Sequence, residues 1–471
     1  MILVLFGISN FFEKFLTMIP IEILLITLAL QCCWIISKFK RNILASPVFY
    51  VTCFGYLIPF FIVGVLDFYF RIPLIRDKGK AVSINPTLIH ECLTLANLSC
   101  FFFSVTVFII TNFINKRFPT KISQNADQVF VNAGISKSSL LVKLFFSLLI
   151  IWIVTVQFYH GIASHFIDGG TLRGGISEGK AGFILPLMQS SLIFPMLALV
   201  SITATTGRSK ILTTIICMLY ILIVFGAAGR GDLIIALFTI ILTCLYSRRQ
   251  KFLWKYRFIS ICFFCLFALY GRIIFDPNNW GTTLPELLYL EFIDLPNTSE
   301  FQLYPLQTFG QSYLHLSWAL EDAGKNLPYH YFNEALIFPL YIIPSFIHGF
   351  SYTTHINVFN NYYYSDVLVG QSGEKMLTYM YLGSGTIGVV IGSIFLGAIT
   401  GLATFISNKL LCSPITVGFA IIFSLQCRSL VGGSFSLQRP FVAIMFGIII
   451  ALLVIGKQKK LYLNNHLTLN I

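Results

Sequence analysis

The sequence predicts an all-α integral membrane protein, a single polytopic domain over residues 1–471 with about eleven spanning helices. Three observations support this prediction. The chain is 56% hydrophobic and 15% aromatic but only 11% charged, whereas a soluble protein carries about 25% charged residues. Apolar runs of about 20 residues, the length that crosses the hydrocarbon core as a helix, recur along the chain. Basic residues gather in alternate connections between these runs.

The predicted helices follow one another from the first apolar run to the last. The initial stretch, MILVLFGISNFFEKFL, is interpreted as an interfacial helix that Pro20 separates from the first span. The spans, with loose ends, are residues 20–37, 47–67, 88–113, 140–159, 183–204, 211–228, 232–246, 258–275, 376–405, 414–431 and 438–456.

The basic connections identify the predicted cytoplasmic side. Because Lys and Arg are retained on that side, we expect a plasma-membrane protein with its N-terminus outside and its C-terminus in the cytoplasm. The net charge of +13 then reflects topology and does not indicate a nucleic-acid partner. The connections are KFKR (38–41), NKRFPTK (115–121), GRSK (207–210), SRRQKFLWKYR (247–257) and KQKK (457–460), with Lys137, Lys143 and Lys409.

Three of the connections on the predicted outer side are long, at residues 68–87, 160–182 and 276–375. The last is the longest, and its many aromatic residues argue against disorder. It contains FNEALIFPLYIIPSFIHGF (332–350), interrupted by two prolines, which we interpret as a helix lying on or dipping into the outer surface. If this segment spanned the membrane instead, Lys409 and KQKK would move outside, against the charge rule.

A charged turn interrupts the apolar sequence at GAAGRGDLIIALF (226–238). Gly229 suits the end of one helix and Asp232 suits the start of the next, but neither explains Arg230. Four more arginines are expected near the outer side: Arg173, Arg272, Arg428 and Arg439. Lipid phosphates are one explanation for each of them. Alternatively, several guanidinium groups meet and bind a lipid diphosphate bidentately.

The same outer side supplies candidates for a general base. These are Glu374, Asp366 and His348, with His315 and His355 as further possibilities. Glu374 also suits a helix N-terminus, His348 suits an interfacial position, and Lys180 has a simple partner in Glu178 in a solvated loop. No spacing indicates a metal site or a cofactor, and the cysteines lie mainly in apolar runs, where they serve as small buried side chains.

Small residues recur through GSGTIGVVIGSIFLGAITG (383–401). Such a stripe favours close packing of helices. A groove for a lipid tail is the alternative.

On these motifs, the chain resembles the oligosaccharide repeat-unit polymerases of bacterial surface polysaccharides, the Wzy type, which make O-antigen and capsule. The likeness covers most of the chain as architecture. Locally, it rests on LRGG around Arg173, GAAGRGDLIIALF around Arg230 and YGRIIFD around Arg272. FPLYIIPSF, followed by YLGSGTIGVVIGSIFLGAITGL, completes it.

This resemblance implies a reaction on the outer face of a bacterial inner membrane. A glycan is transferred from undecaprenyl diphosphate to an acceptor repeat unit, without a nucleotide sugar or another cofactor. Arg173, Arg230 and Arg272 would face the diphosphates, with His348, Asp366 or Glu374 as the base. Lys180, Asp232, Arg428 and Arg439 are the candidate substrate-binding residues. A chain-length regulator and a flippase are the protein partners that the family implies.

Two other functions fit the same features. A flippase or transporter of the lipid-linked oligosaccharide would place charge along a path through the membrane. An O-antigen ligase-like glycosyltransferase would share the arginines and differ in its acceptor.

Overall fold

A computed structural model of the chain describes residues 19–39, 43, 45–72, 74–77, 80–117, 150, 154, 304–332, 375–410, 420–421 and 423–431. The chain divides into two compact units. One unit comprises Met1–Pro119, Leu284–Phe405 and Cys427–Gln438, and the other comprises Thr120–Thr283, Ile406–Gln426 and Arg439–Ile471. The architecture below is that of the first unit.

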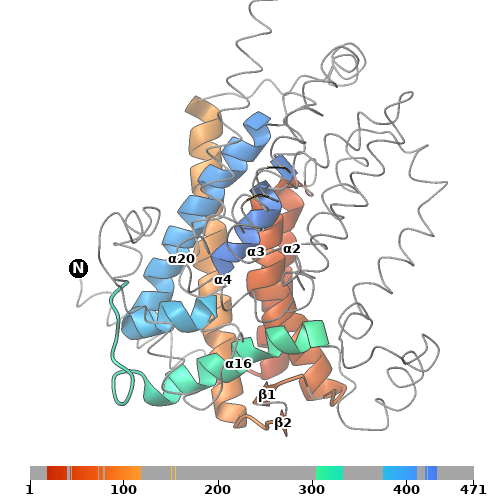
Figure 1. The fold of residues 1–471 in the computed structure, drawn as a ribbon, viewed down its shortest axis with the longest axis vertical. Helices are drawn as coiled ribbons and strands as arrows, with labels where there is room; N and C mark the ends of the chain where they lie inside the picture. Colours follow the sequence, from red (N-terminus) through yellow and green to blue (C-terminus); the bar gives the residue numbers. More distant parts are fainter. Residues whose placement is uncertain are drawn as a thin grey trace, which may run out of the picture. The chain divides into compact units, whose positions relative to one another are not determined.

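Four long apolar helices form the described bundle (Figure 1). They are α2 (Ile21–Lys38), α4 (Pro86–Arg117), α20 (Met376–Leu410) and a composite helix of α3 (Pro47–Thr52), η2 (Cys53–Ile62) and η3 (Val65–Tyr69). Each is long and apolar enough to cross a membrane. Long apolar helices therefore occur where the spans 20–37, 47–67, 88–113 and 376–405 were predicted. Of the other predicted spans, 414–431 is described in part, at residues 420–421 and 423–431, and the rest lie wholly or largely outside the described residues.

Two further elements complete the described fold. Helix α16 (Tyr304–Asp322) comes from the long connection 276–375. A short antiparallel hairpin joins β1 (Arg76–Asp77) to β2 (Lys80–Ala81), and the prediction of an all-α fold did not include it. We call the end of the bundle that carries this hairpin the hairpin end.

The composite helix has wide π turns over most of its length. Pro59 lies inside η2, where it cannot donate to the carbonyl one turn earlier and its ring crowds that position. A wider turn accommodates such a break, and π turns are often found at functional sites.

Cross-helix contacts fix the relative directions of the helices. The side chain of His90 contacts the Ile19 carbonyl at 2.7 Å, and the Trp34 ring lies 6.0 Å from the Phe108 ring, so α2 and α4 are parallel. Helix α20 is parallel to α4 as well, because Gly397 lies against Phe103 and Gly401 against Ile110. The composite helix runs the opposite way. The basic ends Lys38 and Arg117 are therefore both opposite the hairpin end.

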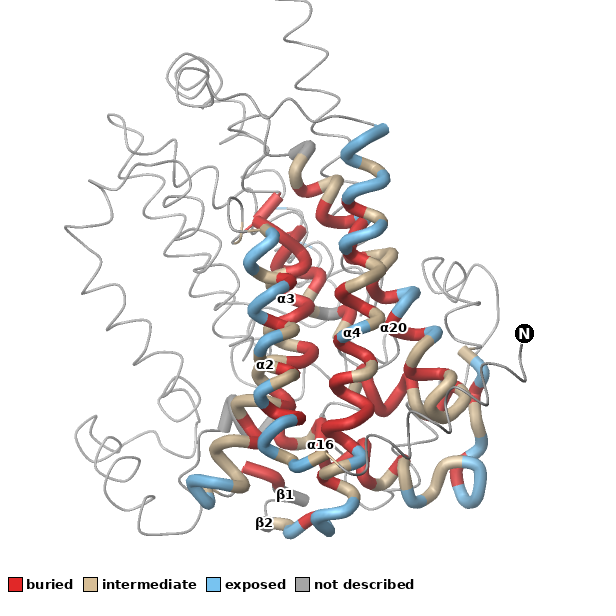
Figure 2. The backbone as a smooth tube through the Cα atoms, turned by 180° about the vertical axis from the view of Figure 1, so that it is seen from behind, coloured by how far each residue is buried: buried red, intermediate tan, exposed pale blue. Residues whose placement is uncertain are grey.

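The faces of these helices differ in exposure (Figure 2). Their inward faces are buried, whereas large apolar side chains are exposed on the outward faces, where a bilayer would cover them. The exposed side chains include Ile26 and Leu30 on α2, Phe101 and Phe113 on α4, and Ile391, Ile394 and Leu402 on α20.

Asp67 organises the chain at the hairpin end. Its carboxylate accepts hydrogen bonds from the backbone N–H groups of Leu74 (2.8 Å) and Ile75 (2.9 Å). The Leu74 carbonyl in turn lies directly against Gly310 of α16. Helix α16 is also tied to the composite helix, since the Tyr313 hydroxyl donates to the Phe60 carbonyl at 2.6 Å. Part of the long connection is thus built into the bundle.

Helix α20 is broken at Ser384 and Gly385. Gly385 has φ 64° and ψ −145°, a conformation essentially restricted to glycine. The break separates a short arm, residues 376–383, from a long arm, residues 386–410. The long arm alone is about 37 Å at 1.5 Å per residue, which exceeds the roughly 30 Å hydrocarbon core. The single straight span predicted at 376–405 is therefore two segments.

The short arm folds back against the long arm and into the bundle. The Met380 side chain lies against Gly392, and the Ser393 hydroxyl contacts its sulfur at 3.7 Å. At the start of the short arm, Met376 is next to Gly55, in the first half of η2. Non-helical breaks of this kind are tolerated at membrane depth where protein surrounds them.

The small-residue stripe at 383–401 now has a structural role. A Cβ at Gly397 would lie 2.8 Å from the Phe103 carbonyl, and one at Gly401 would lie 2.9 Å from Ile110. These two glycines allow α20 and α4 to approach closely, as the packing interpretation predicted.

The directions of α4 and of the long arm of α20 bear on whether the segment 332–350 can span the membrane. The chain leaves α4 at the basic end and begins the long arm at the hairpin end. If these helices cross a membrane, an odd number of crossings must connect them. The five predicted between residues 140 and 275 satisfy this condition, whereas a sixth at 332–350 would not. Residues 333–374 themselves lie outside the described part.

Candidate functional site: a cationic interior at the short arm

The segment Tyr329–Phe332 holds the C-terminal end of the short arm. The His330 and Tyr331 N–H groups donate to the Leu382 and Gly383 carbonyls at 3.0 and 3.1 Å. The broken helix leaves these carbonyls without intrahelical donors. The His330 ring adds a third bond: Nδ1 accepts from the Phe332 N–H (3.0 Å), so Nε2 carries the proton and donates to the Tyr379 carbonyl (2.9 Å).

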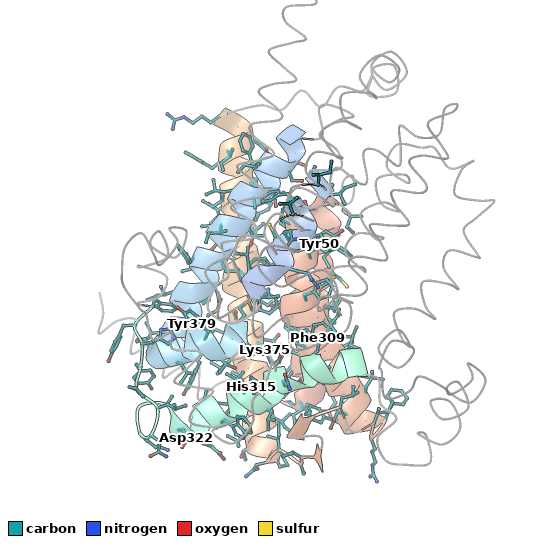
Figure 3. The ribbon with its side chains drawn as sticks, viewed as in Figure 1. Tyr50, Phe309, His315, Asp322, Lys375 and Tyr379 are labelled. Atoms are coloured by element: carbon teal, nitrogen blue, oxygen red, sulfur yellow. The ribbon has the colours of Figure 1, made fainter. Side chains whose placement is uncertain are left out.

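Lys375 stands at the other end of the short arm. Its carbonyl accepts the first bond of the helix, from the Tyr379 N–H at 2.8 Å. The side chain is half-buried, and it lies between the short arm and α16 (Figure 3). Desolvation at this position, which precedes the span, lowers the pKa of the ammonium group to about 8.

His315 lies close to Lys375, on α16. Its side chain is fully buried and stacks on Trp318, with ring centroids 5.6 Å apart. Burial, with a smaller contribution from the Lys375 charge, lowers the pKa of His315 to about 3. The imidazole is therefore neutral at physiological pH. A base this weak does not favour the proton-abstraction role that the sequence offered for His315.

Besides His315, Arg428 is the one predicted site residue that lies in the described part of the chain. It is half-buried in the short helix η7 (Cys427–Val431), which packs against α3 and η2. The expectation placed Arg428 near the outer end of its span. That position stays a prediction; in the structure, Val431, three residues after Arg428, lies against Gly55, beside Met376.

Hydroxyl groups line the interior of the bundle around Gly55, where Met376 and Val431 meet. The Tyr56 hydroxyl bonds Ser99 Oγ at 2.9 Å, and Ser99 Oγ bonds Ser393 Oγ at 2.7 Å. Thr378, in the first turn of the short arm, is fully buried, and its hydroxyl has no hydrogen-bond partner within the described residues. The same holds for Thr52, one turn before Gly55. Buried polar groups of this kind normally have a partner.

The remaining predicted site residues lie outside the described part of the chain. Their predicted meeting at one site therefore stays a prediction. They are Arg173, Lys180, Arg230, Asp232, Arg272, His348, Asp366, Glu374 and Arg439, and His355 and Glu178 share that status.

The described site combines cationic and hydroxyl groups in a bundle interior, which suits binding of an anionic group. No group of three His, Cys, Asp or Glu that could hold a metal occurs among the described residues. The sequence did not single out Lys375, because its neighbour Glu374 already supplied a candidate base there. The available signal was a lysine directly before an apolar run, on the side where cations are predicted to be sparse.

Comparison with known proteins adds no relative: no protein-family model, no curated protein and no solved structure matches this chain. The structure establishes a mostly helical chain with four described helices able to cross a membrane.

Proposed function

We propose that the chain is an oligosaccharide repeat-unit polymerase of the Wzy type, acting on the outer face of a bacterial inner membrane. In this reaction, an acceptor hydroxyl attacks the anomeric carbon of a glycan on undecaprenyl diphosphate. The new glycosidic bond replaces the bond to the diphosphate, a base takes the hydroxyl proton, and undecaprenyl diphosphate leaves. The resemblance around Arg173, Arg230 and Arg272 supports this proposal.

The position of α16 is the observation that carries the proposal. This helix belongs to the long connection 276–375, yet Tyr313 and Gly310 fix it within the bundle at the hairpin end. The charge pattern predicts that this end faces outward, because Lys38, Lys116 and Arg117 mark the opposite end. An outer loop that enters the bundle beside a cationic interior supports the binding of a lipid-linked, anionic substrate at this end.

Arginines of the outer side would stabilise the leaving diphosphate, since a guanidinium forms paired bonds with phosphate oxygens. We expect Arg230→Lys to leave the protein in the membrane but to lose about 1.5–3 kcal/mol of this stabilisation, about tenfold to a hundredfold in rate. Normal long-chain polysaccharide in cells that carry Arg230→Lys together with Arg173→Lys contradicts this role.

A flippase of the same lipid-linked glycan is the second candidate. Lys375 and Arg428 favour it, because both lie on segments that meet at Gly55 inside the bundle. Charges inside a membrane bundle are expected along a transport path. An O-antigen ligase-like enzyme, the third candidate, fits the same groups.

A deletion strain separates the three candidates. Loss of a polymerase leaves surface glycan with single repeat units, and loss of a flippase leaves none. Loss of a ligase leaves polymer that is not joined to its acceptor. The proposal predicts single repeats, restored to long chains by the wild-type gene. Either of the other patterns refutes it.

A further inference from the structure

We propose that Lys375, Thr378 and the N-terminal turn of the short arm of α20 form a binding site for a phosphate group of the lipid-linked substrate. This inference rests on the proposed function for the identity of the ligand, but the site itself follows from the described residues. The arginines that suggested a diphosphate site from the sequence lie outside the short arm, and Lys375 was not among the predicted site residues.

The charge of Lys375 is uncompensated within the described residues. Lys375 is half-buried, and no carboxylate among the described residues forms an ion pair with it. The neighbouring His315 cannot neutralise the ammonium charge, because an imidazole is either neutral or cationic and supplies no negative charge. A cation in a protein interior normally has an anionic partner. A bound phosphate supplies one.

The short arm presents a helix N-terminus beside Lys375. The break at Ser384–Gly385 makes residues 376–383 a separate helical segment, whose N-terminus begins inside the bundle next to Gly55. The first N–H groups of a helix lack intrahelical acceptors and carry a partial positive charge. In membrane transporters, the N-termini of such discontinuous helices point at anionic substrate groups. Lys375 adds a full charge at this terminus.

Thr378 lies in the same turn and provides an independent observation. Its side chain is fully buried, and its hydroxyl has no partner within the described residues. A hydroxyl donates well to a phosphate oxygen. A ligand that accepts from Thr378 and neutralises Lys375 would satisfy both groups at once.

Binding should weaken as pH rises, because the Lys375 ammonium group loses its proton. His315 faces Lys375 from α16, Arg428 lies on the adjoining η7, and Glu374 precedes Lys375 in the sequence. Only the protonated lysine attracts an anion, and desolvation lowers its pKa to about 8. The lysine contribution is therefore present at pH 7 and is lost as pH rises toward 9.5. Arginine at this position keeps its charge over that range.

The test measures binding to the purified full-length protein in nanodiscs, with undecaprenyl diphosphate as the probe. Lys375→Met is expected to weaken binding about tenfold to a hundredfold at pH 7, and Lys375→Arg to retain it. Wild-type affinity should fall between pH 7 and 9.5 more than that of Lys375→Arg. Lys325→Met is the matched control, because Lys325 is exposed and donates to the Glu321 carbonyl on α16.

Competition identifies the source of the phosphate. Inorganic pyrophosphate should compete with the probe in the wild type and much less in Lys375→Met. Phosphatidylglycerol in the nanodisc should not compete. If it competes as well as the probe, the site binds bulk lipid and the inference is overturned. Wild-type binding by a folded Lys375→Met protein overturns it too.

Two safeguards keep the result interpretable. If Lys375→Met does not fold, the different pH profiles of wild type and Lys375→Arg decide the question, and identical profiles overturn the inference. The readout is binding, which does not require polymerisation. A Lys375-dependent site in a protein whose deletion strain keeps long-chain glycan therefore refutes the proposed function and leaves the site standing.

Discussion

Gly310→Ala tests whether α16 is docked in the bundle as described. A Cβ at residue 310 would collide with the Leu74 carbonyl oxygen. The same Cβ would lie 2.9 Å from the Leu74 carbonyl carbon and 3.3 Å from the Ile75 backbone nitrogen. These are backbone atoms, and the Asp67 carboxylate holds the Leu74 and Ile75 N–H groups at 2.8 and 2.9 Å. The loop therefore cannot yield without losing charge-assisted hydrogen bonds.

The sign of the effect makes this substitution informative. In an undocked helix, Gly→Ala stabilises by up to about 1 kcal/mol through helix propensity. In the docked helix, we expect net destabilisation of about 1–3 kcal/mol, the usual cost of an overpacked interior. Displacement of α16 should also reduce polysaccharide length in cells, since His315 would move away from Lys375.

The assay is denaturation of the purified protein in mixed micelles, followed by far-UV circular dichroism. Glu321→Ala serves as the control, because Glu321 is exposed near the end of the same helix. Its free energy of unfolding should change by no more than about 0.5 kcal/mol. A Gly310→Ala protein as stable as the wild type, or more stable, refutes the docking of α16.

Three further predictions follow from the described residues. His330→Ala should lower stability by about 1–3 kcal/mol, because it removes the ring that donates to the Tyr379 carbonyl; unchanged thermal unfolding argues against this contact. Leu30→Arg should reduce membrane insertion, at a cost of about 2.5–3.5 kcal/mol near the centre of a span, whereas Leu30→Met should not; equal insertion of the two places Leu30 away from lipid. Alkaline phosphatase fused after Asn326 should be active and fused after Arg117 inactive; the reverse pattern contradicts the predicted orientation.

Hydropathy and charge predicted the described spans well. The ends of α2, the composite helix and α4 differ from prediction by no more than four residues, as with 88–113 against Pro86–Arg117. The reason is physical: a run of apolar side chains near 20 residues has few stable placements other than across a bilayer. The relative directions of these helices also match the alternation of basic connections.

Tertiary features were not predictable in the same way. The break in α20 lies within a long apolar run, and only the GSG sequence at 383–385 hinted at it. Helix α16 carries many polar residues, so a hydropathy criterion passes over it, and its position depends on distant partners such as Phe60 and Leu74. Lys375 is recognisable as a site residue only from the tertiary structure, in which the short arm enters the bundle.

Reconstituted polymerisation tests the central claim most directly. A deletion strain of a polymerase accumulates lipid-linked single repeat units, and these can be extracted and incubated with the purified protein in liposomes. The account predicts longer lipid-linked glycans and one undecaprenyl diphosphate released for each new linkage. If folded protein that binds undecaprenyl diphosphate leaves these units unchanged in length and releases no undecaprenyl diphosphate, the assignment as a polymerase is contradicted.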